Sequence, residues 1–371
     1  MAAKKSSNHV IKNVADEDWK EFINNIKSHN KQFPDNKVTV RTFFKLLNTY
    51  SPMVRSLMVL DPNDSDVQQL GVNTALHLAP LWVKNIADNL DRIKREHDIR
   101  ELRNIHAGKP AIVIGAGPSL YDNASYTDHL KLISEYRDRF DGVILIADRV
   151  LEPCLKWGIG DFTCVVDGSE KIYQFFDNDT LRQYNNCQAK LHDMKGIFAT
   201  STHKKVVDAW SNGIYFFVPS IPQEILPNAT SLMADFTGSS DINAGGNCGM
   251  LAWNMAAWMG CKEIAMVGMD MSYKINTPIE QTQAYGQYLR SIGKERVHEA
   301  FREGRHPFFE TPYRIDNIYQ TFKTTALIWI KAFRERGTCV TYNCTEGGAL
   351  HGKGIEYMYL KEFLESSCRK G

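Results

Sequence analysis

From residue 111 onward, the chain alternates short apolar runs with segments long enough to form helices. Seven such runs occur, at Ala111–Ile114, Val143–Ala147, Phe162–Val166, Ile197–Ala199, Ile214–Val218, Ile264–Val267 and Cys339–Tyr342. Strands that are apolar along their whole length are buried on both faces, as in a parallel sheet that helices cover on either side. The pattern therefore predicts a doubly wound α/β fold around a mostly parallel sheet of about seven strands.

Two other segments of the 371-residue chain have a different composition. Before the first run, apolar residues such as Leu81 and Ile86 recur at helical spacing among charged residues. We therefore expect a helical N-terminal extension over residues 1–108 and the α/β domain over residues 109–371. Residues 271–315 are polar and contain three prolines. An insertion of this length is typical of a lid or of a segment that binds the second substrate, and a solvated surface excursion is the alternative.

Charge and cysteine content narrow the class of protein. The formal net charge is only +1, from 44 Lys and Arg against 43 Asp and Glu. No nucleic acid is therefore expected as a partner, and an anionic ligand would need a local binding device. The eight cysteines show no C-x-x-C pair and no zinc spacing. We therefore expect free thiols and no metal-binding site. The sequence shows no secretory signal and no apolar window of roughly 18 residues, so we expect a cytoplasmic protein without a membrane span.

The first apolar run ends in a glycine-rich turn, Gly115-Ala116-Gly117-Pro118-Ser119. Glycines let a phosphate approach the backbone N–H groups because no Cβ intervenes, and Ser119 adds a hydroxyl donor. Leu120 replaces the third glycine of the dinucleotide-binding fingerprint, and no Lys-Ser or Lys-Thr pair follows as in a P-loop. The turn is predicted to bind a nucleotide phosphate through its backbone, with a purely structural turn as the alternative.

Aspartates follow three of the runs: Asp148 the second, Asp167 the third and Asp270 the sixth. In open α/β sheets, the residues that follow the strands meet at the carboxyl edge, where ligands bind. Carboxylates there hold ribose hydroxyls, coordinate a divalent cation or accept a proton. We expect Asp148 to contact the nucleotide and Asp167 and Asp270 to be catalytic, whereas a helix N-cap is the structural alternative for each.

Three later features are candidates for the same site. Gly245-Gly246-Asn247 precedes an apolar helical stretch, and its N–H groups can bind an anion unless the glycines serve only helix–sheet packing. Thr345-Glu346-Gly347-Gly348 follows the last run and suits a flexible loop that wraps the donor or acceptor. His351 is a candidate catalytic general base, with a structural histidine as the alternative.

Together these motifs resemble the family that contains the archaeal 6-hydroxymethyl-dihydropterin diphosphokinase MptE and the bacterial motility accessory factors (Maf). The resemblance covers about residues 105–355 and rests on five motifs in order: Gly115–Leu120, Ala147-Asp148, Val165–Asp167, Gly245–Asn247 and Val267–Asp270. It implies a Rossmann-like core similar to that of sialyltransferases, with a nucleotide bound at the Gly-Pro-Ser-Leu loop.

The two branches of this family imply different reactions. The motility accessory factors look like flagellin glycosyltransferases, and they look to carry the Gly-Gly and Thr-Glu-Gly-Gly-Ala motifs that stand here at Gly245-Gly246 and Thr345–Ala349. The pterin kinases look to carry His-Gly-Asp-Asn where this chain has Ala244-Gly245-Gly246-Asn247.

The resemblance therefore favours a transferase that uses a nucleotide-activated sugar of the nonulosonic-acid type. The acceptor (protein, glycan or pterin) and the oligomeric state stay open, and no cofactor is certain. One alternative is an ATP-dependent 6-hydroxymethylpterin diphosphokinase, which would require Mg²⁺. A second alternative is a non-catalytic nucleotide-binding protein.

Overall fold

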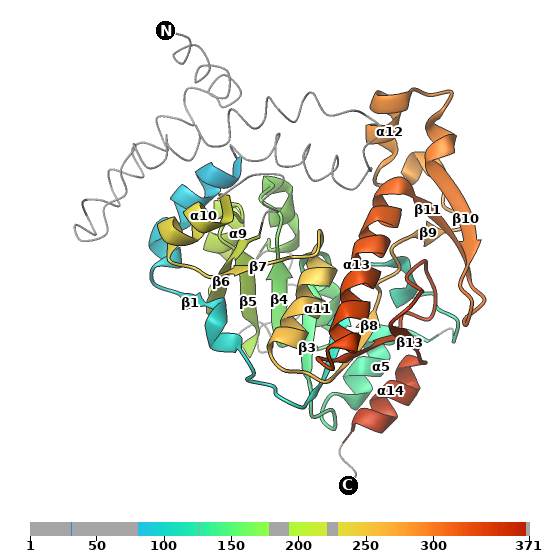
Figure 1. Cartoon of the computed structure of the whole chain (residues 1–371), viewed down its shortest axis with the longest axis horizontal. Coiled ribbons are helices and arrows are strands. Elements are labelled where there is room, and N and C mark those ends of the chain that lie inside the picture. Colours follow the sequence, from blue (N-terminus) through green and yellow to red (C-terminus); the bar gives the residue numbers. More distant parts are fainter. Residues whose placement is uncertain (1–30, 32–80, 126, 178–192, 221–228, 369–371) are drawn as a thin grey trace. The chain divides into compact units, whose positions relative to one another are not determined.

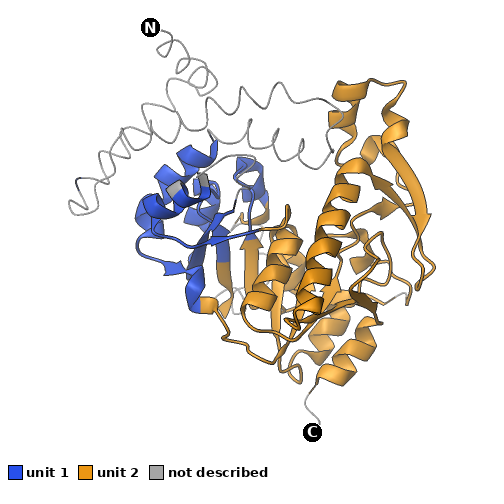
Figure 2. Cartoon of the chain, viewed as in Figure 1, with its two compact units in different colours: residues 1–101, 165–174, 197–243 blue, residues 102–164, 175–196, 244–371 orange. Residues whose placement is uncertain are grey.

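The computed structural model describes residues 31, 81–125, 127–177, 193–220 and 229–368 (Figure 1). The chain forms two compact units (Figure 2). Unit 1 comprises residues 1–101, 165–174 and 197–243, and unit 2 comprises residues 102–164, 175–196 and 244–371.

Unit 2 is built on a parallel sheet with the strand order β4-β3-β2-β8-β12-β13. These strands are β2 (Pro110–Ile114), β3 (Val143–Ala147), β4 (Phe162–Val165), β8 (Glu263–Val267), β12 (Val340–Asn343) and β13 (Ile355–Tyr357). Every residue of β3 is buried, as its continuous apolar sequence predicts. The central strands β2 and β8 pair from Pro110–Glu263 to Ile114–Val267, so that both end side by side.

Helices cover both faces of this sheet. They are α5 (His129–Tyr136), α6 (Leu151–Lys156), α11 (Cys248–Trp258), α13 (Asn317–Glu335) and α14 (Leu360–Ser367) (Figure 1). A further helix, α12 (Tyr285–Ile292), belongs to the polar segment 271–315. Trp253 of α11 packs against Phe333 of α13 and donates a hydrogen bond to Thr341 of β12. The next residue of β12, Tyr342, packs against Phe363 of α14. Since successive strand residues point to opposite faces, α11 and α13 lie on one side and α14 on the other.

The order of the strands defines where a ligand is expected. From β2 the chain passes to β3 and β4 on one side, and it later enters β8 on the other side of β2. The boundary between β2 and β8 is therefore a topological switch point, and its carboxyl edge is the usual ligand position in open α/β sheets.

The polar segment 271–315 is folded. It contains β9 (Tyr273–Lys274), β10 (Phe301–Arg305) and β11 (Pro312–Asp316), which form an antiparallel sheet in the order β10-β11-β9, with α12 between β9 and β10. The segment has an apolar cluster of its own, which includes Tyr288 and Val297. Its role as a lid stays a prediction.

Unit 1 contains β1 (His97–Asp98), β5 (Lys195–Ala199), β6 (Ile214–Pro219) and β7 (Asp241–Ile242), in the order β1-β6-β5 with β7 also paired to β6. Its helices are residues 81–93, α9 (Lys204–Ala209) and α10 (Ala229–Thr237). The 81–93 helix is anchored by Asn85 Nδ2, which donates to Gly168 O at 2.9 Å and to Ser201 O at 2.8 Å.

The doubly wound, mostly parallel α/β fold is confirmed, and all seven predicted strands are present. Among the described residues, the hydropathy pattern missed β1, β7 and β13, which have only two or three residues each. It also missed β9, β10 and β11 of the small antiparallel sheet, which are partly exposed. Helix is confirmed over 81–93, but residues 97–102 form β1 and a 3-10 turn instead. Most of the predicted extension lies outside the described residues, so its boundary at residue 108 stays a prediction.

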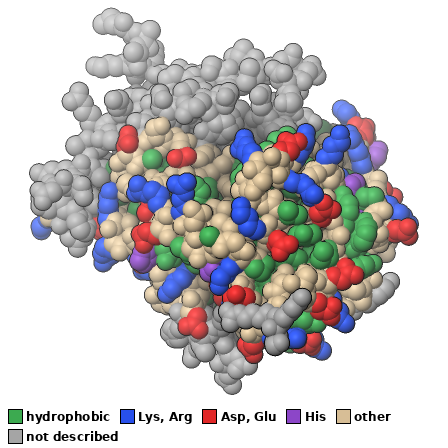
Figure 3. All heavy atoms as spheres, turned by 60° about the horizontal axis from the view of Figure 1, so that its bottom comes forward, with side chains coloured by type: hydrophobic (Ala, Val, Ile, Leu, Met, Phe, Trp, Pro, Cys, Tyr) green, Lys and Arg blue, Asp and Glu red, His purple; other side chains and the backbone are tan. Residues whose placement is uncertain are grey.

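The structure also bears on the predicted state of the cysteines, the distribution of charge and the predicted lack of a membrane span. Seven cysteines are free thiols, as expected, and Cys187 lies outside the described residues. Acidic and basic side chains are interspersed on the face in Figure 3, in keeping with the small net charge. In the described part of the chain, no helix combines the length and apolar character that crossing a membrane requires.

Candidate functional site

The glycine-rich turn lies at the switch point, where the loops after β2 and β8 run side by side. Gly115 N donates to Val267 O and Gly117 N to Gly268 O, both at 2.8 Å. These bonds continue the strand pairing beyond the strand ends, so two of the amides predicted to bind phosphate are already occupied. Ala116 is exposed, and its N–H has no hydrogen-bond acceptor among the described residues. It is the amide of this turn that a ligand can use.

The glycines of the turn are required by the neighbouring loop. A Cβ on Gly117 would lie 1.8 Å from Asp270 Oδ2, and a Cβ on Gly115 would lie 2.6 Å from Met269 Sδ. Gly117 has φ −78°, a backbone conformation open to any residue. It is therefore close approach, and not backbone conformation, that requires glycine at 117. Pro118 follows as the first residue of a 3-10 turn and is half-buried.

Asp270 is the predicted carboxylate that this arrangement positions most firmly. Its side chain is buried, with 5% of the residue exposed, and its Oδ2 accepts a hydrogen bond from Ser119 Oγ at 2.7 Å. Burial raises the pKa of Asp270 to about 6, although hydrogen bonds from Ser119 and the charge of His129 act in the opposite direction. A carboxyl group that titrates close to neutral pH is suited to accept or donate a proton.

The backbone of Asp270 is held by the loop that follows β12. Ala349 N donates to Asp270 O at 2.7 Å, and a Cβ on Gly348 would lie 2.6 Å from Asp270 Cα. The next residue, Met271, has φ +49°, which is uncommon for a residue with a side chain. Backbone strain of this kind persists only where the surroundings enforce it, and it concentrates at functional sites.

Thr345-Glu346-Gly347-Gly348, expected to be flexible, is buried throughout. Thr345 Oγ1 accepts a hydrogen bond from Met269 N at 3.1 Å and donates one to Met266 O at 3.2 Å. Gly347 lies against Thr311, since a Cβ there would be 3.0 Å from Thr311 Oγ1. The motif thus supports the loop that carries Asp270, and its direct contact with a donor or acceptor stays a prediction.

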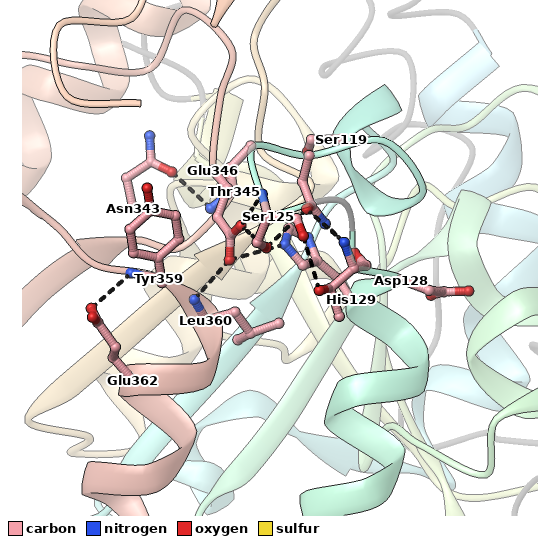
Figure 4. Close-up of polar contacts among 12 residues, drawn as sticks. Ser119, Ser125, Asp128, His129, Asn343, Thr345, Glu346, Tyr359, Leu360 and Glu362 are labelled. Atoms are coloured by element: carbon pink, nitrogen blue, oxygen red, sulfur yellow. Dashed lines mark hydrogen bonds and ion pairs between the residues drawn. The ribbon is translucent and has the colours of Figure 1, made fainter. Parts of the chain in front are cut away.

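Glu346 is the centre of a buried polar cluster (Figure 4). Its Oε1 accepts from Leu360 N at 2.9 Å and lies 3.4 Å from His129 Nε2, and its Oε2 accepts from the amide and the hydroxyl of Ser125. Burial by itself would raise the pKa of Glu346, but the contacts with His129, Ser125 and Leu360 outweigh it and hold the pKa below its usual range. The cluster ties the loop after β12 to the start of α5 and to α14.

Asp148 lies at the end of β3, facing the N-terminus of α11. It is 4% exposed, and its Oδ2 accepts a hydrogen bond from Cys248 Sγ at 3.4 Å. Its Oδ1 accepts from the amide of Arg149 at 2.8 Å. The structure therefore places Asp148 beside the residue that directly follows the Gly-Gly-Asn motif, and nucleotide binding by Asp148 stays a prediction.

The Gly-Gly-Asn motif forms the turn into α11. Gly245 and Gly246 have φ +65° and +85°, which explains the glycines, and Asn247 is the N-cap, whose Oδ1 accepts from Met250 N at 3.0 Å. A Cβ on Gly246 would also contact Phe322 of α13. Anion binding by this motif stays a prediction, with one first-turn amide already used by the cap.

His351 lies between β12 and β13. Its Nε2 is 3.0 Å from the hydroxyl of Tyr313 and 3.5 Å from Lys323 Nζ. Burial, together with Lys323, lowers the pKa of His351 to about 4, so this imidazole is a weak base near neutral pH. A catalytic role for His351 stays a prediction.

Asp167 belongs to unit 1, where it is exposed and its Oδ1 accepts from Ser169 N at 2.8 Å. This is a local turn interaction, and the catalytic role of Asp167 stays a prediction. Among the residues that the structure describes, no three His, Cys, Asp or Glu side chains are grouped so as to hold a metal ion.

The sequence reasoning missed His129, Ser125 and Lys323. His129 and Ser125 contact Glu346, and Lys323 contacts His351. None of the three stands in a recognisable motif or follows a strand. The loop before α5, α5 itself and α13 carry Ser125, His129 and Lys323 to residues that are distant in the sequence.

A known protein family matches the part of the chain that contains most of these residues. The sequence model of the MptE-like family, described as 6-hydroxymethylpterin diphosphokinase MptE-like, matches residues 84–276, just over half of the chain. The chain belongs to the MptE-like family. The matched MptE-like region includes Gly117, Asp148, Asn247 and Asp270, and membership indicates a transferase.

The other comparisons concern individual proteins. No curated protein matches the chain. Among solved structures, the Maf glycosyltransferase from Magnetospirillum magneticum AMB-1 is similar, with 14% sequence identity and a TM-score of 0.48. The match covers 82% of this chain and 45% of that chain, so this chain spans less than half the length of that protein.

Proposed function

We propose that this protein is a nucleotide-dependent transferase in which Asp270 is the general base that activates an acceptor hydroxyl. The observation that carries the proposal is the buried carboxyl of Asp270, hydrogen-bonded to Ser119 at the switch point of the sheet. With a pKa of about 6, this group is mostly ionised at neutral pH and can accept a proton.

The transfer would take place in one displacement. The acceptor hydroxyl gives its proton to the carboxylate of Asp270 while its oxygen attacks the donor carbon. The bond between that carbon and the phosphate oxygen breaks, and the nucleotide leaves with the electron pair. Because the phosphate gains negative charge in this step, fixed N–H dipoles near it lower the barrier.

The N–H dipoles would come from two places in unit 2. The exposed amide of Ala116 lies in the turn after β2, and the N-terminus of α11 presents the positive end of a helix dipole beside Asp148. Asp148 accepts hydrogen bonds in the present structure, and in the complex it would accept them from ribose hydroxyls.

We propose a nucleotide-activated sugar of the nonulosonic-acid type as the donor. The proposal is supported by the resemblance of the Gly245-Gly246 and Thr345–Ala349 motifs to those of the motility accessory factors. It is also supported by the chemistry, since glycosyl transfer needs a base and a stabilised leaving group, and residues of this chain can provide both.

The description of the family favours a second candidate, diphosphate transfer from ATP to a pterin-like alcohol. Asp270 would have the same role there, because the alcohol must also lose its proton. The two candidates differ in the nucleotide and in the need for Mg²⁺.

A thermal-shift panel with CMP, UDP, GDP, ADP and ATP, each with and without Mg²⁺, separates these candidates. A nucleotide at 100 times its dissociation constant should stabilise the protein by about 2.7 kcal/mol. Preference for CMP without metal supports glycosyl transfer, and preference for ATP with Mg²⁺ supports diphosphate transfer. No response to any nucleotide contradicts both.

The role of Asp270 is tested with D270N and the control D122N, which changes an exposed aspartate paired with Lys274. D270N should bind the preferred nucleotide normally and release it from its activated donor about 10²- to 10⁴-fold more slowly, whereas D122N should behave as wild type. Full turnover by D270N would exclude this aspartate as the base.

A further inference from the structure

Three polar side chains from separate elements of unit 2 meet beside the small antiparallel sheet. Tyr313 comes from β11, Lys323 from α13, and His351 from the loop between β12 and β13. His351 Nε2 lies 3.0 Å from the Tyr313 hydroxyl and 3.5 Å from Lys323 Nζ. We call these three residues the Lys323 cluster.

Lys323 is a half-buried cation without a counter-ion. No Asp or Glu among the described residues lies within ion-pair distance of its ammonium group. Lys331, two turns further along the same helix, pairs with Glu335 at 3.6 Å. Burial lowers the pKa of Lys323, which shows that its environment disfavours the charge. Because Lys323 is only half-buried and has no ion-pair partner among the described residues, its ammonium group is available to an incoming anion.

The other members of the cluster do not supply negative charge. The pKa of His351 is lowered to about 4 by burial and by Lys323, so its ring is neutral at neutral pH. His306 packs behind it, with ring centroids 5.3 Å apart, and its Nδ1 accepts from the amides of Phe308 and Phe309. His306 Nε2 lies 3.5 Å from Asn343 Nδ2, so both ring nitrogens of His306 have neighbours within the protein. The donors that remain are those of Lys323 and Tyr313.

The Lys323 cluster lies close to Asp270. Ala349, whose amide donates to Asp270 O, is only two residues before His351, a separation of at most roughly 7 Å along the chain. Tyr319 lies one helical turn before Lys323, and its pKa is raised by burial, by Asp316 and also by the charge of Asp270. An anionic group bound at the cluster would thus lie beside the loop that holds the proposed base.

We propose that Lys323, Tyr313 and His351 form a subsite for a carboxylate or phosphate group of the substrate. The ammonium group of Lys323 supplies the charge, and the Tyr313 hydroxyl supplies a second hydrogen bond. With an anion bound, His351 Nε2 accepts one of the three ammonium protons of Lys323, which leaves the single hydroxyl proton of Tyr313 for the anion. That the bound group belongs to a transferase substrate rests on the proposed function, whereas the binding of a small anion does not.

Calorimetric titration with two probes, inorganic phosphate and N-acetylneuraminate, tests the subsite on the full chain. We expect the wild type to bind at least one of them: phosphate alone would assign the subsite to a phosphate group, and the sugar acid alone to a carboxylate. K323Q should weaken this binding at least about 10-fold, because it removes one charge-assisted hydrogen bond. Y313F should weaken it by a smaller factor. The control K331Q removes one positive charge from the same helix and should bind as wild type.

Three results would overturn the subsite: no binding of either probe, undiminished binding by K323Q, or equal weakening of binding by K323Q and K331Q. Equal weakening would mean that the anion responds only to the overall positive charge of the helix. Thermal unfolding of each variant checks that it is folded. D270N separates this inference from the proposed function, because it should bind the anionic probe normally. If no nucleotide binds but a Lys323-dependent anion does, the proposed function fails and the subsite stands.

Discussion

Replacing Asp270 with asparagine should stabilise the protein at neutral pH while slowing its reaction. Asp270 is almost fully buried, and its pKa is raised from 3.8 to about 6. The folded state therefore prefers the protonated carboxyl group. One pKa unit corresponds to about 1.4 kcal/mol, so a shift of roughly two units means that ionised Asp270 costs on the order of 3 kcal/mol of folding stability. Asparagine has nearly the same shape, can still accept from Ser119 and carries no charge.

The sign of the pH dependence follows from the raised pKa. Below the pKa of the unfolded chain, Asp270 is protonated in both states and imposes no penalty. As the pH rises from about 4 to about 6, the unfolded state ionises first and the folded state loses stability relative to it. Above the folded pKa the penalty is complete. D270N should thus be more stable than wild type by about 1–3 kcal/mol at pH 7 to 8, and the gap should close as the pH falls towards 4.

Urea unfolding of both proteins at several pH values between 4 and 8 measures this gap. The control D122N changes an exposed carboxylate, so its stability should stay within about 0.5 kcal/mol of wild type at every pH. A D270N variant that is less stable than wild type at pH 8, or whose gap does not change with pH, would refute the reasoning. Such a result would mean that the hydrogen bonds from Ser119 outweigh the cost of burying the charge.

Three further substitutions test the supports of Asp270. G117A should lower the free energy of unfolding in urea by about 1–3 kcal/mol, because the new Cβ overlaps the Asp270 carboxylate. The control G286A in α12, where no atom lies nearer than 3.6 Å to the new Cβ, should be neutral or slightly stabilising. Equal effects of the two substitutions would argue against the close approach at Gly117. T345V should cost about 1–3 kcal/mol, since Met269 N loses its acceptor, and a neutral result would show that water replaces the hydroxyl. E346Q should be less stable than wild type at neutral pH, because the lowered pKa of Glu346 means that its ionised form stabilises the folded wild type. This contribution is lost in acid, so the difference between the two proteins should fade there, and a difference that persists in acid would contradict the prediction.

The sequence predicted the sheet of unit 2 because a strand buried on both faces must be apolar throughout, and β3 is an example. It also placed Asp148 and Asp270 correctly at strand ends, since chain topology brings those ends to one edge. Both conclusions depend on local pattern alone. The short strands β1, β7 and β13 have too few residues to carry such a pattern.

The partners of the motifs were harder to predict. A Gly-x-Gly turn leaves space for any group that approaches closely, and the space at Gly117 is used by the carboxylate of Asp270 from a loop far along the chain. Thr345–Gly348 has the composition of a flexible loop, yet contacts from β8 and α5 bury it. In both cases long-range packing decided the outcome, and single-sequence patterns do not contain that information.

The close approach of three loops around Asp270 limits how this site can change during evolution. At Gly117 and Gly348 a Cβ would overlap atoms of Asp270, and at Gly268 it would lie 2.6 Å from the carbonyl oxygen of Gly115. Asp270 therefore has little freedom to shift by small steps, because each step needs simultaneous changes in loops that follow different strands. New substrate preferences are more accessible through side chains outside these packed loops, such as Lys323 and the surface of the 271–315 segment. Directed evolution of specificity should accordingly accumulate substitutions there and leave the three glycines untouched.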